Sequence, residues 1–458
     1  MNKKVLIIAG AAVGFLIIIL ILIAIMASKG GGKHKTTEST KFPSENLTLT
    51  MWYLFDDKAA YEPIVEAYQK EHKNVTINLV KKDPTEYETE LINALAGGSG
   101  PDIFMIHNDW LPKHQDKLAP MPEDYMSVDE YKKTFAPVAA TDLISDNRIY
   151  GIPFYIDTLA LFYNNKLVRE YNSALNKRTD LTSEQEKNLY ISQPPQNWND
   201  FIEQAKKLTK KNGTSIIQAG VALGTSNNVE SSQDILSLLM LQNNTKMVSE
   251  DKKTPTFNLS SRDSAGNIIY PGTKALDFYT SFALPNKETY CWNSSMPSST
   301  DAFIQEKAAM MFNYSYVIAK IKNLAPDLDY KIVEVPQVKN TENKIYYANY
   351  WPFAVSKNSK YPQVGWDFLK YASQNTWQSL YHQTTQRPSP KWRHGATSSD
   401  PFVSQLEAAI SWYKGKVPDK VDQIFKDMIT AVVEKKQPSQ QAIDAAAQNI
   451  ITLWSANQ

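Results

Sequence analysis

The chain has 458 residues, of which 42% are hydrophobic and 21% charged, a composition typical of an ordinary folded protein. This length predicts two or three domains. Residues 1–41 carry six lysines and one acid, Glu38, so the remainder has a net charge of −4. A mildly acidic body without a basic stripe argues against nucleic acid as the partner.

The N-terminus contains an unbroken run of apolar and small residues, Val5–Met26, which follows two lysines. At about 1.5 Å per residue, a helix of this length spans the roughly 30 Å core of a bilayer, and the run exceeds the about 7–15 apolar residues of a cleaved signal peptide. No cysteine directly follows it, which excludes a lipoprotein anchor. We therefore expect residues 1–27 to form an uncleaved transmembrane signal-anchor and residues 28–45 to form a flexible linker.

After the linker, the hydrophobic pattern is that of an α/β protein. Alternating apolar residues predict strands at Leu47–Met51 and Val75–Leu79, and an apolar run predicts a third at Ile103–Ile106. Helical spacing predicts one helix around Ile64–Tyr68 and another from Pro84 to the pair Gly97-Gly98. Strands and helices that alternate at such short intervals predict a right-handed, doubly wound parallel sheet.

Polar and aromatic residues follow two of these strands. In doubly wound sheets, ligands bind beyond the carboxyl ends of the strands. Here those ends read Phe55-Asp56-Asp57 and His107-Asn108-Asp109-Trp110. Both loops place polar groups beside an aromatic ring, which suits a ligand better than a plain turn.

The second part of the chain continues with mixed helices and strands. We expect a polar insertion or surface helix over residues 170–192 and a helix whose N-cap is Asn197, with Asp200 at the third helical position. The further expected elements are a strand at Ala219–Leu223, helices at Asp234–Gln242 and Lys274–Ala283, strands at Ala308–Phe312, Tyr330–Val335 and Tyr346–Val355, and mainly helices after Tyr361.

One aromatic, β-rich stretch, Tyr150–Lys166, contains a carboxylate at Asp157. A carboxylate inside such a run is costly to bury unless another group pairs with it. Two interpretations follow from the residues alone. Either the segment is an edge strand whose Asp157 faces water, or it crosses between two lobes and presents Asp157 to a cleft.

Several kinds of chemistry are not indicated by the sequence. The single cysteine, Cys291, permits no internal disulfide and no cysteine-based metal site, and we expect it to be buried as a small hydrophobic residue. No nucleophile-elbow, zinc-protease, phosphate-loop or dinucleotide motif is present. Of the six histidines only His107 and His114 come near metal-ligand spacing, and seven positions across a proline is a poor one. We therefore expect no catalytic residues, no metal and no cofactor.

Six short motifs in the right order resemble one family, the family 1 extracellular solute-binding proteins of ABC importers. This is the maltose-binding-protein-like group with the periplasmic-binding-protein type II fold. The motifs are G-S-G-P-D-I-F (98–104), Y-G-I-P-F with Y-N-N-K-L (150–167), P-P-Q-N-W-N-D-F with A-K-K-L-T (194–209), A-F-I-Q-E-K-A-A-M-M-F (302–312), F-A-V-S-K-N-S (353–359) and W-D-F-L-K-Y (366–371).

The resemblance implies two α/β lobes joined by crossovers that close on a ligand by hinge motion. The crossovers are expected near Ile156–Leu161, Tyr347–Pro352 and His394–Phe402. Lobe 1 would comprise residues 46–156 and 352–394, and lobe 2 residues 160–348 and 402–458.

The resemblance also implies a set of ligand-binding residues in the loops that face the cleft. Asp157 matches a carboxylate that contacts ligand hydroxyls, and Tyr316 matches an aromatic stacking position. The full expected set is Asp56, Asn108, Asp109, Trp110, Asp157, Asn227, Tyr316, Trp351 and Arg387. The chain departs from maltodextrin-binding relatives in one respect, because Val417–Ile429 contains no tryptophan.

The function that this resemblance implies is capture of a ligand by a membrane-anchored, extracytoplasmic solute-binding protein that delivers it to an ABC permease. A sugar is favoured, because carboxylate and amide groups bind hydroxyls and aromatic rings stack on the CH faces of sugars. A peptide or polyamine ligand stays open. The alternatives are a ligand-sensing subunit of a membrane receptor and, behind it, a surface glycosidase.

Overall fold

The computed structural model describes residues 44–391 and 398–457. The chain divides between Glu45 and Asn46, and every element described below lies in the unit that begins at Asn46. The expected signal-anchor, and the linker as far as residue 43, lie outside the described residues. Within the described ranges, no helix combines the length and the apolar composition that a bilayer crossing requires.

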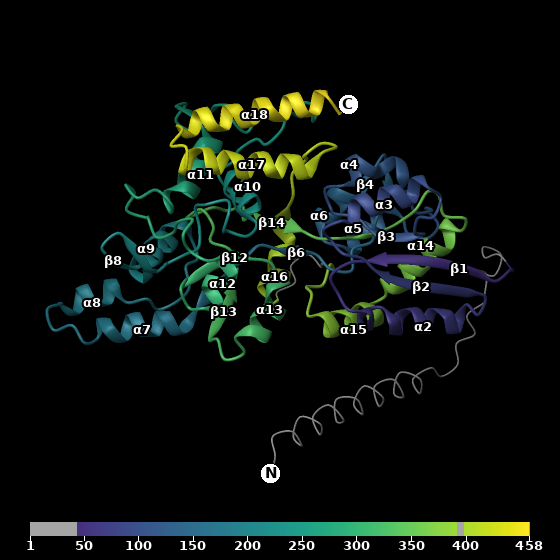
Figure 1. Ribbon diagram of the computed structural model, residues 1–458, viewed down its shortest axis with the longest axis horizontal. Coiled ribbons are helices and arrows are strands. Elements are labelled where there is room, and N and C mark those ends of the chain that lie inside the picture. Colours follow the sequence, from purple (N-terminus) through teal and green to yellow (C-terminus); the bar gives the residue numbers. More distant parts are fainter. Residues whose placement is uncertain (1–43, 392–397, 458) are drawn as a thin grey trace, which may run out of the picture. The chain divides into compact units, whose positions relative to one another are not determined.

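The first lobe is built on a four-stranded sheet of order β15-β3-β1-β2. Its strands are β1 (Leu47–Tyr53), β2 (Val75–Lys81), β3 (Ile103–Met105) and β15 (Phe353–Val355). β1 pairs in parallel with both β2 and β3, as the alternating pattern predicts, whereas β15 adds to β3 in the antiparallel sense. Figure 1 shows β1 and β2 side by side, with helix α2 (Glu62–Glu71) beneath them.

The helices of this lobe begin and end close to the predicted positions. α2 buries Ile64, Val65 and Tyr68 on one face, and the helix expected from Pro84 begins at Tyr87. The remaining elements of this part of the chain are η1 (Lys58–Ala60), α3 (Tyr87–Ala96), α4 (Leu111–His114), η2 (Gln115–Lys117), α5 (Val128–Thr134), α6 (Pro137–Leu143), the hairpin β4 (Ile144–Ser145) and β5 (Arg148–Ile149), α14 (Pro362–Ala372) and α15 (Asn375–Thr385).

The second lobe contains a three-stranded sheet of order β12-β7-β13. Its strands are β7 (Ala160–Asn164), β12 (Met310–Asn313) and β13 (Tyr330–Val333). Both outer strands run antiparallel to β7, so this sheet differs from the doubly wound parallel sheet that the fold class implied.

The strand expected at Ala219–Leu223 is reduced to an isolated bridge between Ala219 and Ala308. The segment still bonds beside β12, because the Ala219 amide donates to the Lys307 carbonyl at 2.8 Å and the Ala222 amide donates to the Met310 carbonyl at 3.0 Å. Two contacts of Gly220 hold the segment against the preceding helix. The Gly220 amide donates to the Thr209 hydroxyl rather than to a strand, and a Cβ at Gly220 would lie 1.9 Å from the Ala205 carbonyl oxygen. The segment therefore lies between the end of the preceding helix and β12, where it forms an irregular edge of the sheet.

Helices and short hairpins surround this second sheet, and Figure 1 shows α17 and α18 running side by side. The Asn197 side chain caps α9 by accepting from the backbone of Asn199 and Asp200, which confirms the predicted helix start. The elements are α7 (Asn165–Leu175), α8 (Ser183–Leu189), α9 (Trp198–Leu208), β8 (Lys210–Asn212), β9 (Ser215–Gln218), α10 (Ser232–Gln242), β10 (Ser261–Arg262), β11 (Ile268–Ile269), α11 (Pro271–Ser281), α12 (Ser299–Ile304), α13 (Val317–Leu324), α16 (Pro401–Ser404), η3 (Gln405–Ala408), α17 (Pro418–Val433) and α18 (Ser439–Ser455).

A third, small sheet is formed by the segments that connect the lobes. β14 (Tyr346–Asn349) pairs antiparallel with β6 (Asp157–Thr158) and parallel with β16 (Ala409–Ile410). β14 and β15 were expected as one strand, but Tyr350–Pro352 separates them, and Pro352 has no amide hydrogen to donate to a ladder. Because three passages of the chain pair here, we call this sheet the hinge sheet.

Candidate functional site

A cavity of about 630 Å³ lies at the hinge sheet, within the size range of small-molecule sites. Its wall draws on five separate segments: the loop after β1, the β6 crossover, the loop after β12, the end of β14 and the end of α15. The residues of those segments that the argument uses are Phe55, Asp56, Tyr155, Asp157, Tyr314, Ser315, Tyr316, Asn349, Trp351 and Arg387.

Aromatic rings lie on this wall from both lobes. The half-buried Trp351 meets Phe55 edge-on, with ring centroids 5.6 Å apart. Tyr316, at the start of α13, is 47% exposed and lies nearly parallel to Tyr314 at a centroid distance of 6.4 Å. Exposed ring faces beside a few polar groups suit a ligand that has both CH faces and hydroxyl groups.

A buried ion pair forms another part of the wall. The Arg387 Nε donates to Asp56 Oδ1 at 3.2 Å, and both side chains are largely buried. The other Asp56 oxygen accepts from the hydroxyls of Tyr61 and Tyr381 at 3.1 and 2.7 Å. The guanidinium also lies 4.7 Å from the centre of the Tyr155 ring. The two charges neutralise each other, and the tyrosines hold the carboxylate in place.

Asp157 lines the cavity, and its buried carboxylate has hydrogen-bond donors as partners. Its oxygens accept from the backbone amide of Ser315 at 2.9 Å, from the Ser315 hydroxyl at 2.6 Å and from the Thr158 amide at 3.0 Å. Burial raises the pKa of Asp157 to about 6, while the hydrogen bonds from Ser315 and the nearby Arg387 oppose this rise. Asp157 therefore does not face water from an edge strand, and Ser315 in the loop after β12 is its main hydrogen-bond partner.

Five of the nine expected ligand residues line this cavity: Asp56, Asp157, Tyr316, Trp351 and Arg387. The other four lie outside its wall. Asn108 is buried, where it donates to Asp142 and pairs with the Tyr350 backbone, and Asp109 is buried between two cations. Trp110 is 5% exposed behind Trp351, and Asn227 is exposed to solvent in the loop before α10.

Of the ten wall residues named above, the expected ligand set lacked five: Phe55, which precedes Asp56, and Tyr155, Tyr314, Ser315 and Asn349. Each had a local signal. Tyr155 precedes Asp157 by two positions, a spacing that returns an extended chain to the same face. Tyr314 and Ser315 follow the apolar strand that leads to Tyr316, and Asn349 lies within the second expected crossover, Tyr347–Pro352.

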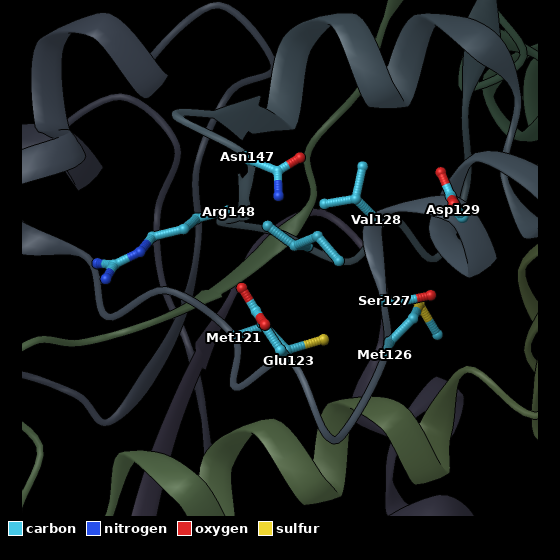
Figure 2. A pocket seen from close by; sticks show the side chains of 9 residues that line it. Met121, Glu123, Met126, Ser127, Val128, Asp129, Asn147 and Arg148 are labelled. Atoms are coloured by element: carbon cyan, nitrogen blue, oxygen red, sulfur yellow. The ribbon is translucent and has the colours of Figure 1, made fainter.

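A smaller cavity of about 280 Å³ lies in the first lobe and shares no lining residue with the one at the hinge sheet (Figure 2). Its wall consists of Met121, Glu123, Met126, Ser127, Val128, Asp129, Asn147, Arg148 and Ile149. These residues include no aromatic ring and none of the expected ligand residues, so the cavity at the hinge sheet is the better candidate site.

The protein belongs to the bacterial extracellular solute-binding protein family. The model of that family matches residues 54–379, which is well over half of the chain. A putative binding protein of Brucella abortus (strain 2308) is 22% identical over 330 residues, which cover 70% of each protein. The protein is therefore a solute-binding protein and not an enzyme, in agreement with the sequence analysis.

Solved structures share its fold. The sugar-binding protein MalE of Xanthomonas citri is 19% identical, with a TM-score of 0.70 over 90% of this chain and 98% of that one. The cyclic α-maltosyl-1,6-maltose binding protein of Arthrobacter globiformis is 17% identical, with a TM-score of 0.70 over 89% of this chain and 99% of that one. These likenesses confirm the two-lobed α/β fold.

Proposed function

We propose that this protein captures an uncharged oligosaccharide at the hinge sheet and delivers it to the permease of an ABC importer. The observation that carries the proposal is the composition of the cavity wall. Trp351 and Tyr316 offer ring faces from the two lobes, while Asp157, Asn349 and the Asp56–Arg387 pair offer groups that bind hydroxyls.

The charges of the wall favour an uncharged ligand over a peptide or a polyamine. Arg387 is neutralised by Asp56, and Asp157 is already held by Ser315. Neither of these two charges is left without a partner for an ionic group on the ligand, and the remaining charge of the wall, the exposed Lys322 ammonium, would repel the cationic groups of a polyamine. The names of the two structural neighbours, a sugar-binding protein and a cyclic maltosyl-maltose binding protein, point in the same direction.

A thermal-shift screen tests the proposal directly. Protein beginning at Ser44 is heated with maltotriose, maltotetraose, mannotriose and a galacto-oligosaccharide, and with spermidine and a lysine dipeptide as charged comparisons. We expect at least one sugar to raise the melting temperature, because a ligand that binds only the folded state stabilises it. Stabilisation by the charged compounds alone would overturn the assignment, and calorimetry then measures the affinity of the best sugar.

The membrane attachment is a separate part of the proposal. Val5–Met26 would anchor the protein, with residues 28–45 as a tether and the binding domain on the extracytoplasmic side. Full-length protein should then sediment with membranes, whereas protein that begins at Ser44 should be soluble. Recovery of a trimmed, freely secreted form that begins near Ala27 would contradict the anchor.

The alternative to import is sensing, in which the same ligand-bound form reports to a membrane receptor. Deletion of the gene distinguishes the two roles. Import predicts that uptake of the radiolabelled panel sugar is lost, whereas sensing predicts normal uptake and a lost transcriptional response to that sugar.

A further inference from the structure

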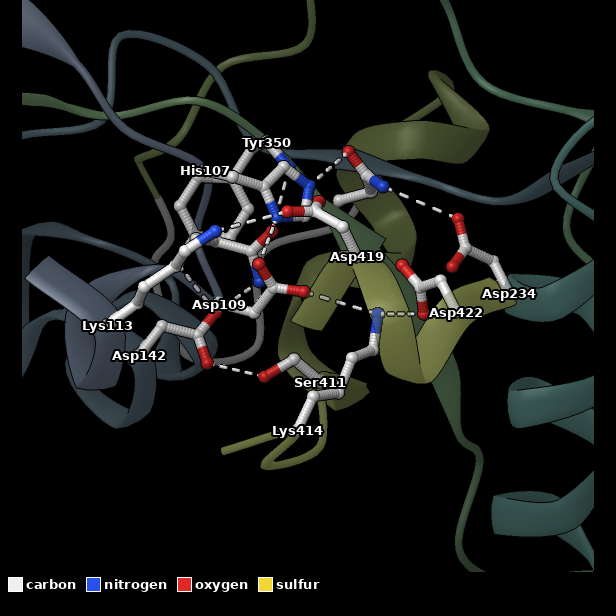
Figure 3. A network of polar contacts seen from close by, with 12 residues as sticks. His107, Asp109, Lys113, Asp142, Asp234, Tyr350, Ser411, Lys414, Asp419 and Asp422 are labelled. Atoms are coloured by element: carbon white, nitrogen blue, oxygen red, sulfur yellow. Dashed lines mark hydrogen bonds and ion pairs between the residues drawn. The ribbon is translucent and has the colours of Figure 1, made fainter. Parts of the chain in front are cut away.

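A continuous line of polar contacts runs from the interior of the protein to the cavity wall (Figure 3). At its centre is His107, in the loop after β3. Its Nδ1 lies 2.5 Å from Asp109 Oδ1, and its Nε2 lies 3.1 Å from the side-chain oxygen of Asn349. Asn349 belongs to β14 and lines the cavity. The ring therefore connects a buried carboxylate to a residue that ligand can reach.

Behind His107, the cluster joins distant parts of the chain. The second oxygen of Asp109 lies 3.2 Å from the Lys414 ammonium, which also lies 2.7 Å from Asp422 on α17. Lys414 is only 3% exposed, so its charge depends on these two carboxylates. With cations on both sides, Asp109 stays ionised, and its pKa lies well below the usual value because His107 and Lys414 outweigh the effect of burial.

The other side of Asn349 is also occupied. Its amide nitrogen donates to Asp234 on α10 at 3.4 Å, and the Tyr314 hydroxyl donates to the same carboxylate oxygen at 2.9 Å. Within the described part of the chain, the second N–H of the Asn349 amide has no acceptor. Its oxygen, by contrast, already accepts from His107.

We propose that His107, held as an imidazolium by Asp109, fixes the orientation of the Asn349 amide and so makes Asn349 a hydrogen-bond donor to the ligand. The contacts require this protonation state, because the carboxylate of Asp109 and the amide oxygen of Asn349 are both acceptors, and only an imidazolium donates from both ring nitrogens. His107 is thus a positioning residue, and Asn349 is a residue that determines specificity for a ligand oxygen.

The electrostatic surroundings agree with this assignment. Burial alone would lower the pKa of His107, but the Asp109 carboxylate outweighs it and raises the pKa to about 9, against the opposing charge of Lys414. The charged groups that face the ring are Asp109 and Lys414, with Asp234 and Asp422 one contact further away. A neutral His107 with an unprotonated Nε2 would instead favour the flipped amide, which turns its oxygen toward Asp234.

A double-mutant cycle tests the positioning role of His107. This inference rests on the proposed function, because the cycle measures the affinity for a sugar. The probe is whichever panel sugar, for example maltotetraose or mannotriose, gives the largest thermal shift. His107→Phe should raise its dissociation constant about tenfold, as the loss of one aligned hydrogen bond would. In an Asn349→Ala background the same change should have little further effect, because His107 acts only through Asn349. Additive losses, or an unchanged affinity in His107→Phe, would overturn the inference.

Two further variants separate positioning from folding. His114 is also a buried histidine that contacts a carboxylate, Glu88, at 2.6 Å, but it does not line the cavity, so His114→Phe should leave affinity unchanged. His107→Gln keeps one donor for Asn349 and should restore part of the affinity if His107→Phe folds poorly. A loss of affinity in His114→Phe equal to that in His107→Phe would indicate a general packing effect and reject the specific role.

Nuclear magnetic resonance of the ring nitrogens tests the protonation state without any ligand. We expect both nitrogens of His107 to carry hydrogen at pH 7, and affinity for the probe to weaken as the pH rises through about 9. A neutral ring at pH 7 would overturn the inference. If no panel sugar binds, the proposed function fails, and the resonance measurement alone then decides whether His107 holds Asn349 in this orientation.

Discussion

The indole rings of Trp110 and Trp351 meet edge to face, with centroids 5.0 Å apart and planes inclined by 71°. Both residues belong to the expected ligand set, yet only Trp351 lines the cavity, whereas Trp110 is buried behind it. Trp110 therefore acts as the support on which the ligand-facing ring rests.

This arrangement predicts opposite phenotypes for the two tryptophans. Trp110→Ala should lower the free energy of unfolding by about 3–5 kcal/mol, because it leaves a cavity in the core. Trp351→Ala should mainly weaken sugar binding, by about 1–3 kcal/mol. Urea unfolding and calorimetry on both variants measure the two effects, and an exchange of the two phenotypes would contradict the assignment.

Tyr316 is expected to contribute to affinity without contributing to stability. Tyr316→Ala should weaken binding of the panel sugar by about 1–3 kcal/mol, because a ligand would cover its exposed ring face. The matched control is Tyr190→Ala, since Tyr190 is also 47% exposed but lies outside the cavity wall. Equal affinities for the two variants would show that Tyr316 is an ordinary surface residue.

The Asp56–Arg387 pair should behave as a coupled unit. Arg387→Met leaves the buried Asp56 carboxylate with only tyrosine hydroxyls and should lower the free energy of unfolding by about 3 kcal/mol. Adding Asp56→Asn removes the unpaired charge, so the double variant should be more stable than the sum of the single losses predicts. Urea unfolding of all four proteins gives the coupling energy, and strict additivity would show that the pair is not energetically linked.

The raised pKa of Asp157 determines in which direction the free energy of unfolding changes with pH. Folding raises this pKa from 3.8 to about 6, so the folded state binds the proton more tightly than the unfolded state does. Protonation of Asp157 therefore stabilises the folded state fully below about pH 4, and this contribution to the free energy of unfolding is lost as the pH rises through 6. The stability of the wild type relative to Asp157→Asn should therefore increase by up to about 3 kcal/mol between pH 7 and pH 4.

An exposed carboxylate provides the control of opposite sign. Asp83 accepts from the Thr85 amide at 2.8 Å, and this hydrogen bond lowers its pKa. The stability of the wild type relative to Asp83→Asn should therefore decrease as the pH falls toward 3. If the Asp157 difference stays flat with pH, or follows the direction of Asp83, the carboxylate is not desolvated as the structure indicates.

The parts of the fold that depend on local burial were predictable from the sequence. β1 shows its alternation directly, because Leu47, Leu49 and Met51 face the core. The Ala219–Leu223 segment has the same apolar character and bonds beside β12, but it forms no regular ladder, and Gly220 contacts Ala205 and Thr209 of the preceding helix end. Such contacts depend on the position of a neighbouring helix, which no local pattern records.

The candidate site was predictable to the level of its loops but not of its side chains. Asn108, Asp109 and Trp110 follow a strand end, as ligand residues do, yet their partners come from remote positions such as Asp142 and Lys414. A buried lysine more than 300 residues away turns Asp109 inward, and a sequence pattern cannot reveal that competition. Asn349, which was not predicted, reaches the wall because its β14 pairs with the crossover of Asp157.

The burial of Cys291 makes this protein convenient for optical work. It is the only cysteine in the sequence, it packs near the Val221 carbonyl, and burial raises its pKa to about 11, so it stays a thiol that reagents do not reach at neutral pH. A cysteine introduced at Lys322, on the cavity wall, would then be the one site that a maleimide dye modifies. The labelled protein would report sugar capture as a change in fluorescence, without removal of any native residue that packs in the core.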